Sequence, residues 1–178
     1  MTIYMSSDLH FCHNNILQLG RGRPFSNIQE MNETLITRWN SVVQPTDTIY
    51  CLGDMAFRQS KGEFTDIFKQ LKGIKHLIIG NHDNDEVIHQ PWQSTSFIKE
   101  IKIDGKHIVL CHYPMRSWNR MYRHGLHLYG HEHGNMPDYS NCLDVGADRW
   151  DYTPASFEQI LERMSNLTPF PIEQVSYK

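Results

Sequence analysis

The segment His76-Leu77-Ile78-Ile79-Gly80-Asn81-His82-Asp83 passes from apolar to polar and ionisable residues within one step of the chain. Residues 76–79 are typical of a short buried strand, and the glycine that follows is typical of a turn. The sequence therefore predicts a strand that delivers Asn81 and His82 to the loop at its carboxyl end.

Four other short apolar runs, at 3–5, 48–52, 107–111 and 126–129, are followed by polar motifs in the same way. In open α/β sheets, ligands bind beyond the carboxyl ends of the strands, so these motifs are expected to converge in one crevice. The candidate ligands that the five runs deliver are Asp8, His10, Asp54, Asn81, His82, His112, His131 and His133.

The segments between the runs include three predicted helices. Apolar residues recur at helical spacing over 28–43 and 64–71. Thr153 is expected to cap a last helix, with Pro154 at its first position. The order β-α-β-α-β, then mostly β, then α, indicates a layered α/β domain whose sheet is covered by helices.

Composition bounds the class of protein. The 178 residues, 39% of them hydrophobic, predict one globular domain over 1–178. The net charge of −3 argues against a sequence-independent grip on nucleic acid through a large basic surface. No apolar run approaches the roughly 20 residues of a membrane span, so no membrane partner is expected. Four cysteines without a CxxC pair, and the absence of a leader sequence, favour the cytoplasm.

The candidate ligands predict a metal centre. In extended backbone, residues two apart point to the same side, so the pair Asp8 and His10 and the pair His131 and His133 are each expected to clasp one cation. Carboxylates, an amide and imidazoles without thiolates suit Mn foremost, with Fe, Zn, Ni or Co as alternatives. The donors are too many for one tetrahedral ion, which favours two divalent ions about 3.5–4 Å apart, bridged by a carboxylate and a water. Two carboxylates against two divalent ions leave a positive surplus that attracts phosphate.

Together, the ordered motifs Asp8-x-His10, Gly53-Asp54, Gly80-Asn81-His82-Asp83, His112 and Gly130-His131-x-His133 resemble those of the calcineurin-like metallophosphoesterase superfamily. The His112-Tyr113-Pro114 neighbourhood is similar to that of its small bacterial and phage branch. The resemblance implies a four-layer α/β/β/α sandwich of two facing mixed sheets with helices outside.

The same resemblance implies a role for each site residue. One ion would be held by Asp8, His10, Asp54 and His133, and the other by Asp54, Asn81, His112 and His131. Asp54 would bridge the two ions, and a bridging water would attack phosphorus in line. His82 would stand over the substrate and either donate a proton to the leaving oxygen or stabilise charge in the transition state, which makes Asp54 and His82 the catalytic candidates.

The substrate is predicted only as a class. Some protein phosphatases of the superfamily follow the second motif with an Asp and an Arg, where this chain has Phe57 and Arg58. The missing acid disfavours a phosphoprotein relative to another phosphoester. We expect a phosphodiester, in a domain without an evident cap to restrict substrate size, and a nucleotide or a nucleic-acid end becomes a candidate if a basic segment borders the metal cleft. Arg58, His13 and Arg116 are the substrate-binding candidates. A phosphomonoesterase and a non-catalytic scaffold of the same fold are the alternatives, and the oligomeric state is left open.

Two basic segments carry weaker hypotheses. Residues 116–123 combine arginines with Trp118 and Tyr122, which favours either base stacking or a short amphipathic helix with an exposed basic face. The loop Arg21-Gly22-Arg23 is a similar candidate for contact with a nucleotide or nucleic-acid phosphodiester if it borders the metal cleft. Asp83 is expected to hold its loop and not a metal.

Overall fold

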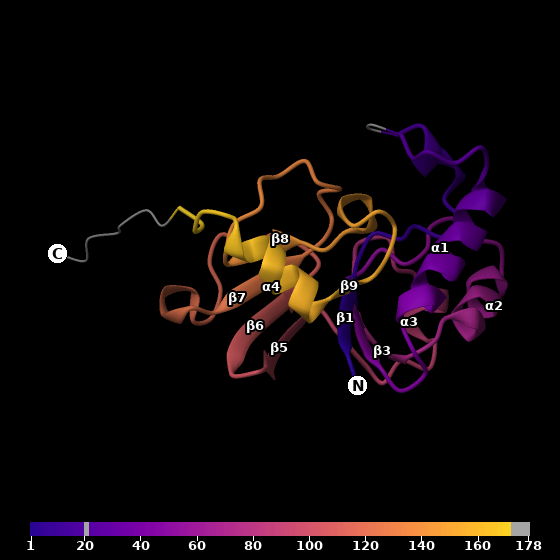
Figure 1. Cartoon of the computed structure of the whole chain (residues 1–178). Helices are drawn as coiled ribbons and strands as arrows, with labels where there is room; N and C mark the ends of the chain where they lie inside the picture. Colours follow the sequence, from indigo (N-terminus) through magenta and orange to yellow (C-terminus); the bar gives the residue numbers. More distant parts are fainter. Residues whose placement is uncertain (20–21, 172–178) are drawn as a thin grey trace.

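The computed structural model describes residues 1–19 and 22–171, which build two facing β-sheets with helices (Figure 1). The first sheet has the strand order β4-β3-β2-β1-β9, in which β1 to β4 are parallel and β9 is antiparallel to β1. Because four strands share one direction, their carboxyl ends lie along one edge of the sheet. The strands are β1 (Ile3–Ser6), β2 (Thr48–Cys51), β3 (Ile74–Ile78), β4 (Ser94–Ser96) and β9 (Ala155–Ser156).

The second sheet has the order β5-β6-β7-β8, with β5 antiparallel and the other three parallel. A two-residue turn at Asp104 and Gly105, both with positive φ, joins β5 to β6. Both sheets are therefore mixed, as the resemblance implies. The strands are β5 (Ile98–Ile103), β6 (Lys106–Cys111), β7 (Leu126–Tyr129) and β8 (Cys142–Asp144).

Helices cover the outer face of the first sheet, to the right in Figure 1. Helix α1 begins after Asn27, whose side chain accepts a hydrogen bond from the backbone N–H of Glu30, and buries Met31, Leu35 and Trp39. The helices are α1 (Ile28–Val42), α2 (Glu63–Gln70), α3 (Asp85–Ile88) and α4 (Phe157–Ser165), with short 3-10 helices η1 (Asn14–Leu17), η2 (Met121–Arg123) and η3 (Ala147–Arg149).

Alternation along the strands divides the apolar residues between the layers. In β2, Ile49 and Cys51 pack against the helices, whereas Leu52, just after the strand, packs between the sheets. In β7, Leu128 faces the first sheet, while Tyr129 faces outward. The inter-sheet core joins Met5, Leu52 and Ile78 of one sheet to Leu110, Leu128 and Leu143 of the other.

The outer face of the second sheet is covered by the segment around η2. Trp118 and Met121 are buried there against Val109 and Cys142. Helix α4 instead contributes Ile160 and other apolar residues to the core between the sheets. The four layers are therefore helices, sheet, sheet, and a short 3-10 helix with its flanking loops.

The predicted start of the last helix is wrong. Thr153 and Pro154 precede the helix, and residues 155–156 form β9, which pairs with β1. The N-cap is Ser156, which forms a capping box with Gln159. Pairing with β1 keeps residues 155–156 extended, so the helix starts where that pairing ends. Among the residues described, none of the helices has the length and apolar character needed to cross a bilayer.

Candidate metal centre

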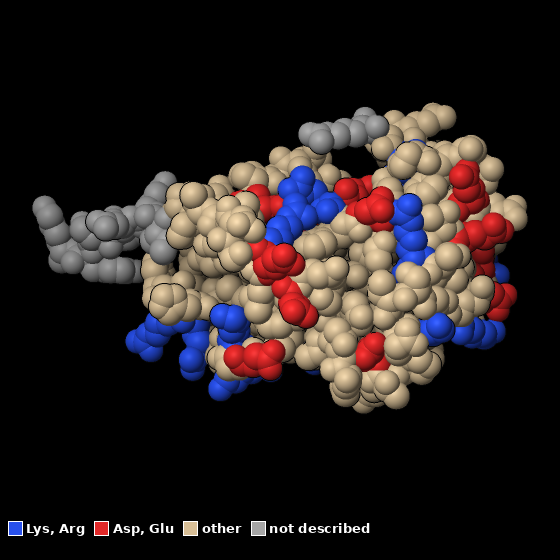
Figure 2. Space-filling view, viewed as in Figure 1, with Lys and Arg blue, Asp and Glu red and all other residues tan. Residues whose placement is uncertain are grey.

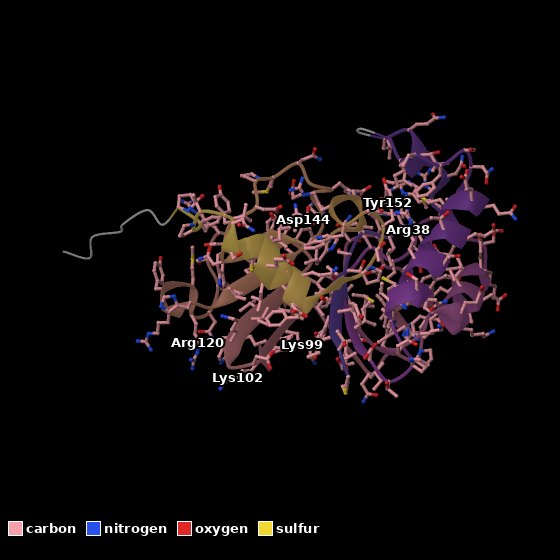
Figure 3. All side chains as sticks on the ribbon, in the orientation of Figure 1. Arg38, Lys99, Lys102, Arg120, Asp144 and Tyr152 are labelled. Atoms are coloured by element: carbon pink, nitrogen blue, oxygen red, sulfur yellow. The ribbon has the colours of Figure 1, made fainter. Side chains whose placement is uncertain are left out.

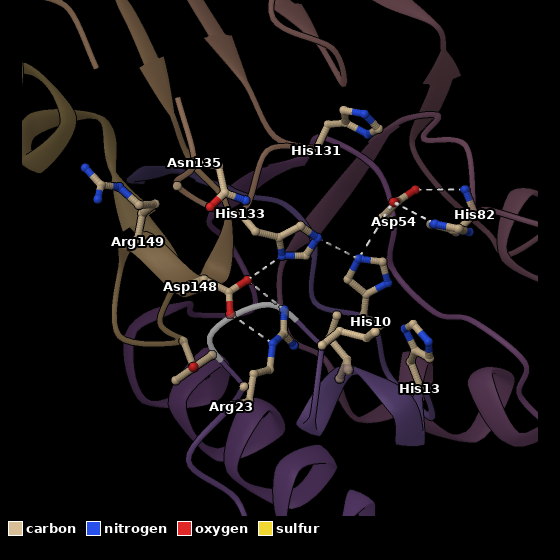
Figure 4. Close-up of a pocket in the computed structure, with 15 residues that line it drawn as sticks. His10, His13, Arg23, Asp54, His82, His131, His133, Asn135, Asp148 and Arg149 are labelled. Atoms are coloured by element: carbon tan, nitrogen blue, oxygen red, sulfur yellow. Dashed lines mark hydrogen bonds and ion pairs between the residues drawn. The ribbon is translucent and has the colours of Figure 1, made fainter. Parts of the chain in front are cut away.

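The five motifs meet at the carboxyl ends of β1, β2, β3, β6 and β7, where the two sheets face each other (Figure 4). Within the described residues, two triplets of side chains place their ligand atoms within 4.8 Å of one another. We call them the first group and the second group. The first group is Asp8, His10 and His133, and the second is Asp54, His112 and His131.

The first group leaves a buried carboxylate oxygen without a partner. Asp8 Oδ1 is buried and accepts no hydrogen bond, and it lies 4.0 Å from His10 Nε2 and 3.9 Å from His133 Nε2. The two imidazole nitrogens are 3.3 Å apart. Leaving a buried acceptor unsatisfied costs about 1–3 kcal/mol or more when it is charged, so a cation among these three atoms fits the site.

Burial sets the protonation states of the first group. It raises the pKa of Asp8 to about 7 and lowers the pKa of His10 well below its ordinary value. His10 is therefore a neutral imidazole, the form that binds metals. Asp8 is protonated about half of the time near neutral pH in the metal-free chain, so a cation would displace that proton.

The second group is anchored by the backbone of a neighbouring strand. His112 Nδ1 is 2.7 Å from the carbonyl oxygen of Leu52, so it donates its proton there and leaves Nε2 for the site. Nε2 lies 3.1 Å from Asn81 Oδ1 and 3.5 Å from Asp54 Oδ2. Burial alone would lower the pKa of His112, but the hydrogen bond and charge of Asp54 raise it to about 9.

Asp54 faces both groups through one oxygen. Its Oδ2 lies 3.5 Å from His112 Nε2 and 3.7 Å from His10 Nε2. Its Oδ1 accepts a hydrogen bond from the backbone N–H of His82 at 2.9 Å. Burial would raise the pKa of Asp54, but the hydrogen bond and charge of His112 bring it to about 2, so this carboxylate is ionised across the physiological range.

The backbone at the site is left-handed and not extended. Asp8, His10, Asp54, His131 and His133 all have φ between 49° and 73°. Non-glycine residues adopt this conformation at a cost of the order of 1–3 kcal/mol, and they do so mainly at functional sites. Each strand ends before the ligand residues, so the chain turns sharply there.

The prediction that each pair of residues two apart binds one cation is wrong for one of the two pairs. Asp8 and His10 do share a group, but His131 and His133 belong to different groups. The two-residue rule holds only for extended backbone, whereas the ligand residues of both pairs lie in the left-handed region, so their spacing does not fix which of them share a group.

Two motif glycines are required by close packing. A Cβ at Gly80 would clash with Asp54, and a Cβ at Gly130 would clash with the side chains of Ser7 and Asp8. Neither position has room for a side chain, so these glycines let the loops approach the carboxylates.

His82 stands beside the groups and belongs to neither. Its Nε2 is 4.0 Å from Asp54 Oδ2, and its side chain is 36% exposed. Its ring packs at 4.4 Å, centroid to centroid, against Phe57, the residue found in place of the acid. Asp83 accepts hydrogen bonds from the backbone of Gly80, Asp54 and Met55, which confirms that it holds the loop.

A cavity of about 670 Å³ opens over the centre. His13 lines it, with Nδ1 buried and without a partner and its ring 5.3 Å from that of His10. Arg58 and Arg116 are not among the described residues that line it. Arg58 is exposed and stacks over Phe57, and Arg116 is exposed on the loop after β6.

The basic segment 116–123 lies away from this cavity. It forms only a three-residue 3-10 helix, η2, instead of an amphipathic α-helix. Figure 3 shows Arg120 at lower left with Lys99 and Lys102, which lie on β5, the edge strand of the second sheet opposite β8 and its Asp144. Figure 2 shows Lys and Arg gathered at lower left in the same view. Of the loop Arg21-Gly22-Arg23, Arg21 lies outside the described residues, whereas Gly22 and Arg23 line the cavity.

Sequence reasoning missed Asp144 and Asp148, and it considered Arg23 only as part of a basic loop that could border the cleft. Asp148 accepts a hydrogen bond from His133 Nδ1 at 2.7 Å and forms an ion pair with Arg23. Asp144 is buried and accepts from the backbone of Gly134 and Gly146. A signal was present, because the short apolar run Cys142-Leu143 is followed by the acids Asp144 and Asp148, in the way that the other runs are followed by polar residues.

Comparison with known proteins agrees with this geometry. Residues 1–144 match the calcineurin-like phosphoesterase superfamily domain. The chain is 32% identical over 168 residues to the uncharacterized protein MJ1445 of Methanocaldococcus jannaschii, covering 90% of this chain and 89% of that protein. It is 24% identical over 181 residues to the gene 66 protein of Mycobacterium phage L5, covering 83% and 86%.

Among solved structures, the fold is similar to that of the protein of unknown function AQ665 from Aquifex aeolicus. The TM-score is 0.73 and the identity 27%, over 91% of this chain and 98% of that one. The match over residues 1–144 spans every motif of the centre. The chain thus belongs to the calcineurin-like phosphoesterase superfamily and is a metal-dependent phosphoesterase.

Proposed function

We propose that the protein hydrolyses phosphodiesters with two divalent metal ions, Mn foremost, one at each group. The observation that carries the proposal is the position of Asp54 Oδ2, which lies within 3.7 Å of His10 Nε2 on one side and of His112 Nε2 on the other. One carboxylate oxygen between two sets of imidazoles suits a shared ligand. When bound, two such ions act as Lewis acids toward the phosphoryl oxygens and lower the pKa of water.

The residues of each group divide the holding of the ions. Asp8, His10 and His133 would hold one ion, and Asp54 would contribute to both. Asn81 lies in hydrogen-bond reach of His112 Nε2, so its amide oxygen would join the second group. The two carboxylates leave a net positive site, which would orient the anionic phosphoryl group against the centre.

His82 would donate a proton to the leaving oxygen. Its side chain is partly exposed, faces the cavity beside Asp54 and is held by its own backbone N–H and by the Phe57 ring. A positioned imidazole of this kind contributes typically 10²- to 10⁴-fold to rate.

The charges around the cavity support a diester over a monoester. Both arginines that line it are paired, Arg23 with Asp148 and Arg149 with Asp138. Among the described lining residues, a monoester dianion would therefore meet arginines that already pair with a carboxylate, although Arg149 Nε has no hydrogen-bond partner, whereas a diester brings only one charge to compensate. Ile16, Leu19 and Tyr152 line the same cavity and offer surface to an organic substituent, such as that of a nucleotide or a nucleic-acid end.

The four cysteines are free thiols, which supports a reducing, cytoplasmic setting for this activity.

The test is hydrolysis of bis(4-nitrophenyl) phosphate and of 4-nitrophenyl phosphate with added Mn²⁺. We expect kcat/KM for the diester to be higher by at least about tenfold, a difference of about 1.4 kcal/mol in the barrier. A preference for the monoester would mean that the protein is a phosphomonoesterase instead. If the parent protein were no more active than the Asp54→Asn variant, the proposal of metal-dependent hydrolysis would be refuted.

A further inference from the structure

We propose that Arg23 and Asp148 are positioning residues that clamp the first group together across the two sheets. The inference rests on the proposed two-ion function for its chemical meaning, but its geometry stands on side-chain contacts alone. His133 follows β7 in the second sheet, whereas Asp8 and His10 follow β1 in the first. A cation site built from both sheets needs something that sets the distance between them.

Asp148 orients the histidine that comes from the second sheet. Its Oδ2 lies 2.7 Å from His133 Nδ1 (Figure 4), so the imidazole carries its proton on Nδ1. The other ring nitrogen, Nε2, lies 3.9 Å from Asp8 Oδ1. A carboxylate on the far nitrogen of a ligating histidine fixes its tautomer and orientation. Asp148 lies in η3, so the hydrogen bond also ties the loop after β7 to that helix.

Arg23 ties the same carboxylate to the first sheet. Its Nε and Nη2 donate to the two oxygens of Asp148 at 3.0 and 2.9 Å. Its Nη2 also donates to the carbonyl oxygen of Asp8 at 2.6 Å, and its Nη1 to that of Leu9 at 2.7 Å. One guanidinium therefore holds the backbone of the loop after β1 and the side chain that orients His133.

The same contacts exclude a substrate-binding role for Arg23. A guanidinium has five N–H donors, and the fifth points to the sulfur of Met31 at 3.7 Å. All five are therefore committed to protein atoms, although Arg23 lines the cavity. The side chain is nearly fully buried, so the ion pair with Asp148 is a fixed feature and not a mobile surface pair.

The second group is tied across the two sheets by a different contact, outside the Arg23–Asp148 clamp. His112 is oriented by the main-chain carbonyl of Leu52. The clamp thus predicts an effect on one ion only. A residue that merely stabilises the fold would weaken both ions alike, and this difference separates the two roles.

The test uses the full chain and variants Asp148→Asn and Arg23→Lys. Both oxygens of Asp148 accept hydrogen bonds, and asparagine replaces one of them by an amino group that cannot accept. Lysine lacks the planar guanidinium with which Arg23 donates to both oxygens at once. Arg38→Lys is the matched control, because Arg38 also stacks over Tyr152 and pairs with an acid of the same region, Asp151, but contacts no ligand residue. Free Mn²⁺ is counted by electron paramagnetic resonance during titration of each metal-free protein.

We expect both variants to lose about 10- to 100-fold in affinity for one of two ions and to keep the other within about threefold. Arg38→Lys should match the parent at both. Equal weakening of both ions, or of neither, would overturn the proposal. The selective loss would stand even if no phosphodiester were hydrolysed, so the two proposals fail separately.

A second readout needs neither metal nor activity. In the metal-free chain in alkaline buffer, nitrogen-15 shifts of the His133 ring should report a proton on Nδ1, moving toward the Nε2 tautomer in Asp148→Asn. If Asp148→Asn does not fold, Arg23→Lys gives the same test of the fork. An unchanged tautomer in the folded variant would contradict the role of Asp148.

Discussion

The two groups of the centre differ in what holds their histidines. His112 of the second group is 1% exposed and donates to a main-chain carbonyl, whereas His133 of the first group is 28% exposed and donates to a side chain. A main-chain acceptor survives most substitutions, while a side-chain acceptor can be removed by one. The comparison teaches that two ligand sets alike in composition can differ in how easily they are disrupted.

The largest expected effect comes from removing what the two groups share. Asp54→Asn would replace the oxygen that faces both His10 and His112, so both ions should weaken together and kcat should fall further than the roughly 10- to 100-fold of a supporting residue. Metal content after dialysis and the diesterase rate measure it. Retention of two tightly bound ions would show that the groups do not share this carboxylate.

The His82→Ala substitution should have the next largest effect on kcat, and it should leave metal binding at both groups unchanged. The imidazole belongs to neither group, so we expect kcat to fall by roughly 10²- to 10⁴-fold with both ions still bound. Metal analysis alongside the diesterase assay is the measurement, with His89→Ala, an exposed histidine in the turn after α3, as control. Loss of an ion would make His82 a ligand.

Asn81→Ala probes the second group alone. Its amide oxygen lies 3.1 Å from His112 Nε2, so the variant should weaken one ion by roughly 10- to 100-fold, taking the loss of a supporting residue as the scale. This ion should not be the one affected by Asp148→Asn. The double variant, titrated with Mn²⁺, should show both losses, roughly additive. Loss of the same ion in both single variants would erase the distinction between the groups.

The pH dependence of metal binding gives the smallest effect. Asp8 has a pKa of about 7 and His112 of about 9 in the metal-free chain, so each group must release a proton to bind a cation. Affinity should therefore rise with pH, by at most tenfold per unit for each proton released. Calorimetry in buffers of different ionisation enthalpy counts those protons. Binding that does not change between about pH 6 and about pH 9 would contradict both pKa shifts.

The same shifts predict how the metal-free chain responds to acid. A carboxyl whose pKa is raised on folding destabilises the folded state above that pKa, so protonating Asp8 should stabilise the metal-free chain as pH falls from about 7 toward 4. Asp54, with a pKa of about 2, has the opposite sign and loses its contribution only below about pH 4. Urea unfolding in chelator at several pH values measures both. The lowered pKa of His10 opposes this trend, so the contribution of Asp8 is read as the difference between the parent and Asp8→Asn, and a difference that does not change between about pH 4 and about pH 7 would contradict the Asp8 shift.

Sequence reasoning predicted the two mixed sheets and the meeting of the five motifs. It was wrong where local rules gave way to tertiary contacts. The last helix begins at Phe157 instead of near Thr153, because residues 155–156 pair with β1. His131 and His133 belong to different groups, and the two-residue rule does not apply because the backbone at these ligand residues is left-handed instead of extended. The roles of Arg58, His13 and Arg116 stay predictions, although His13 alone of the three lines the cavity.

The chain's own residues determined which donors are available and at which strand ends they lie, because strand periodicity and abrupt polarity changes are local properties. Only the tertiary structure decided how those donors divide into two groups and what orients them. Arg23 reaches Asp148 across 125 positions of sequence, and no local pattern encodes a hydrogen bond between residues so distant. Packing of the two sheets brings them together.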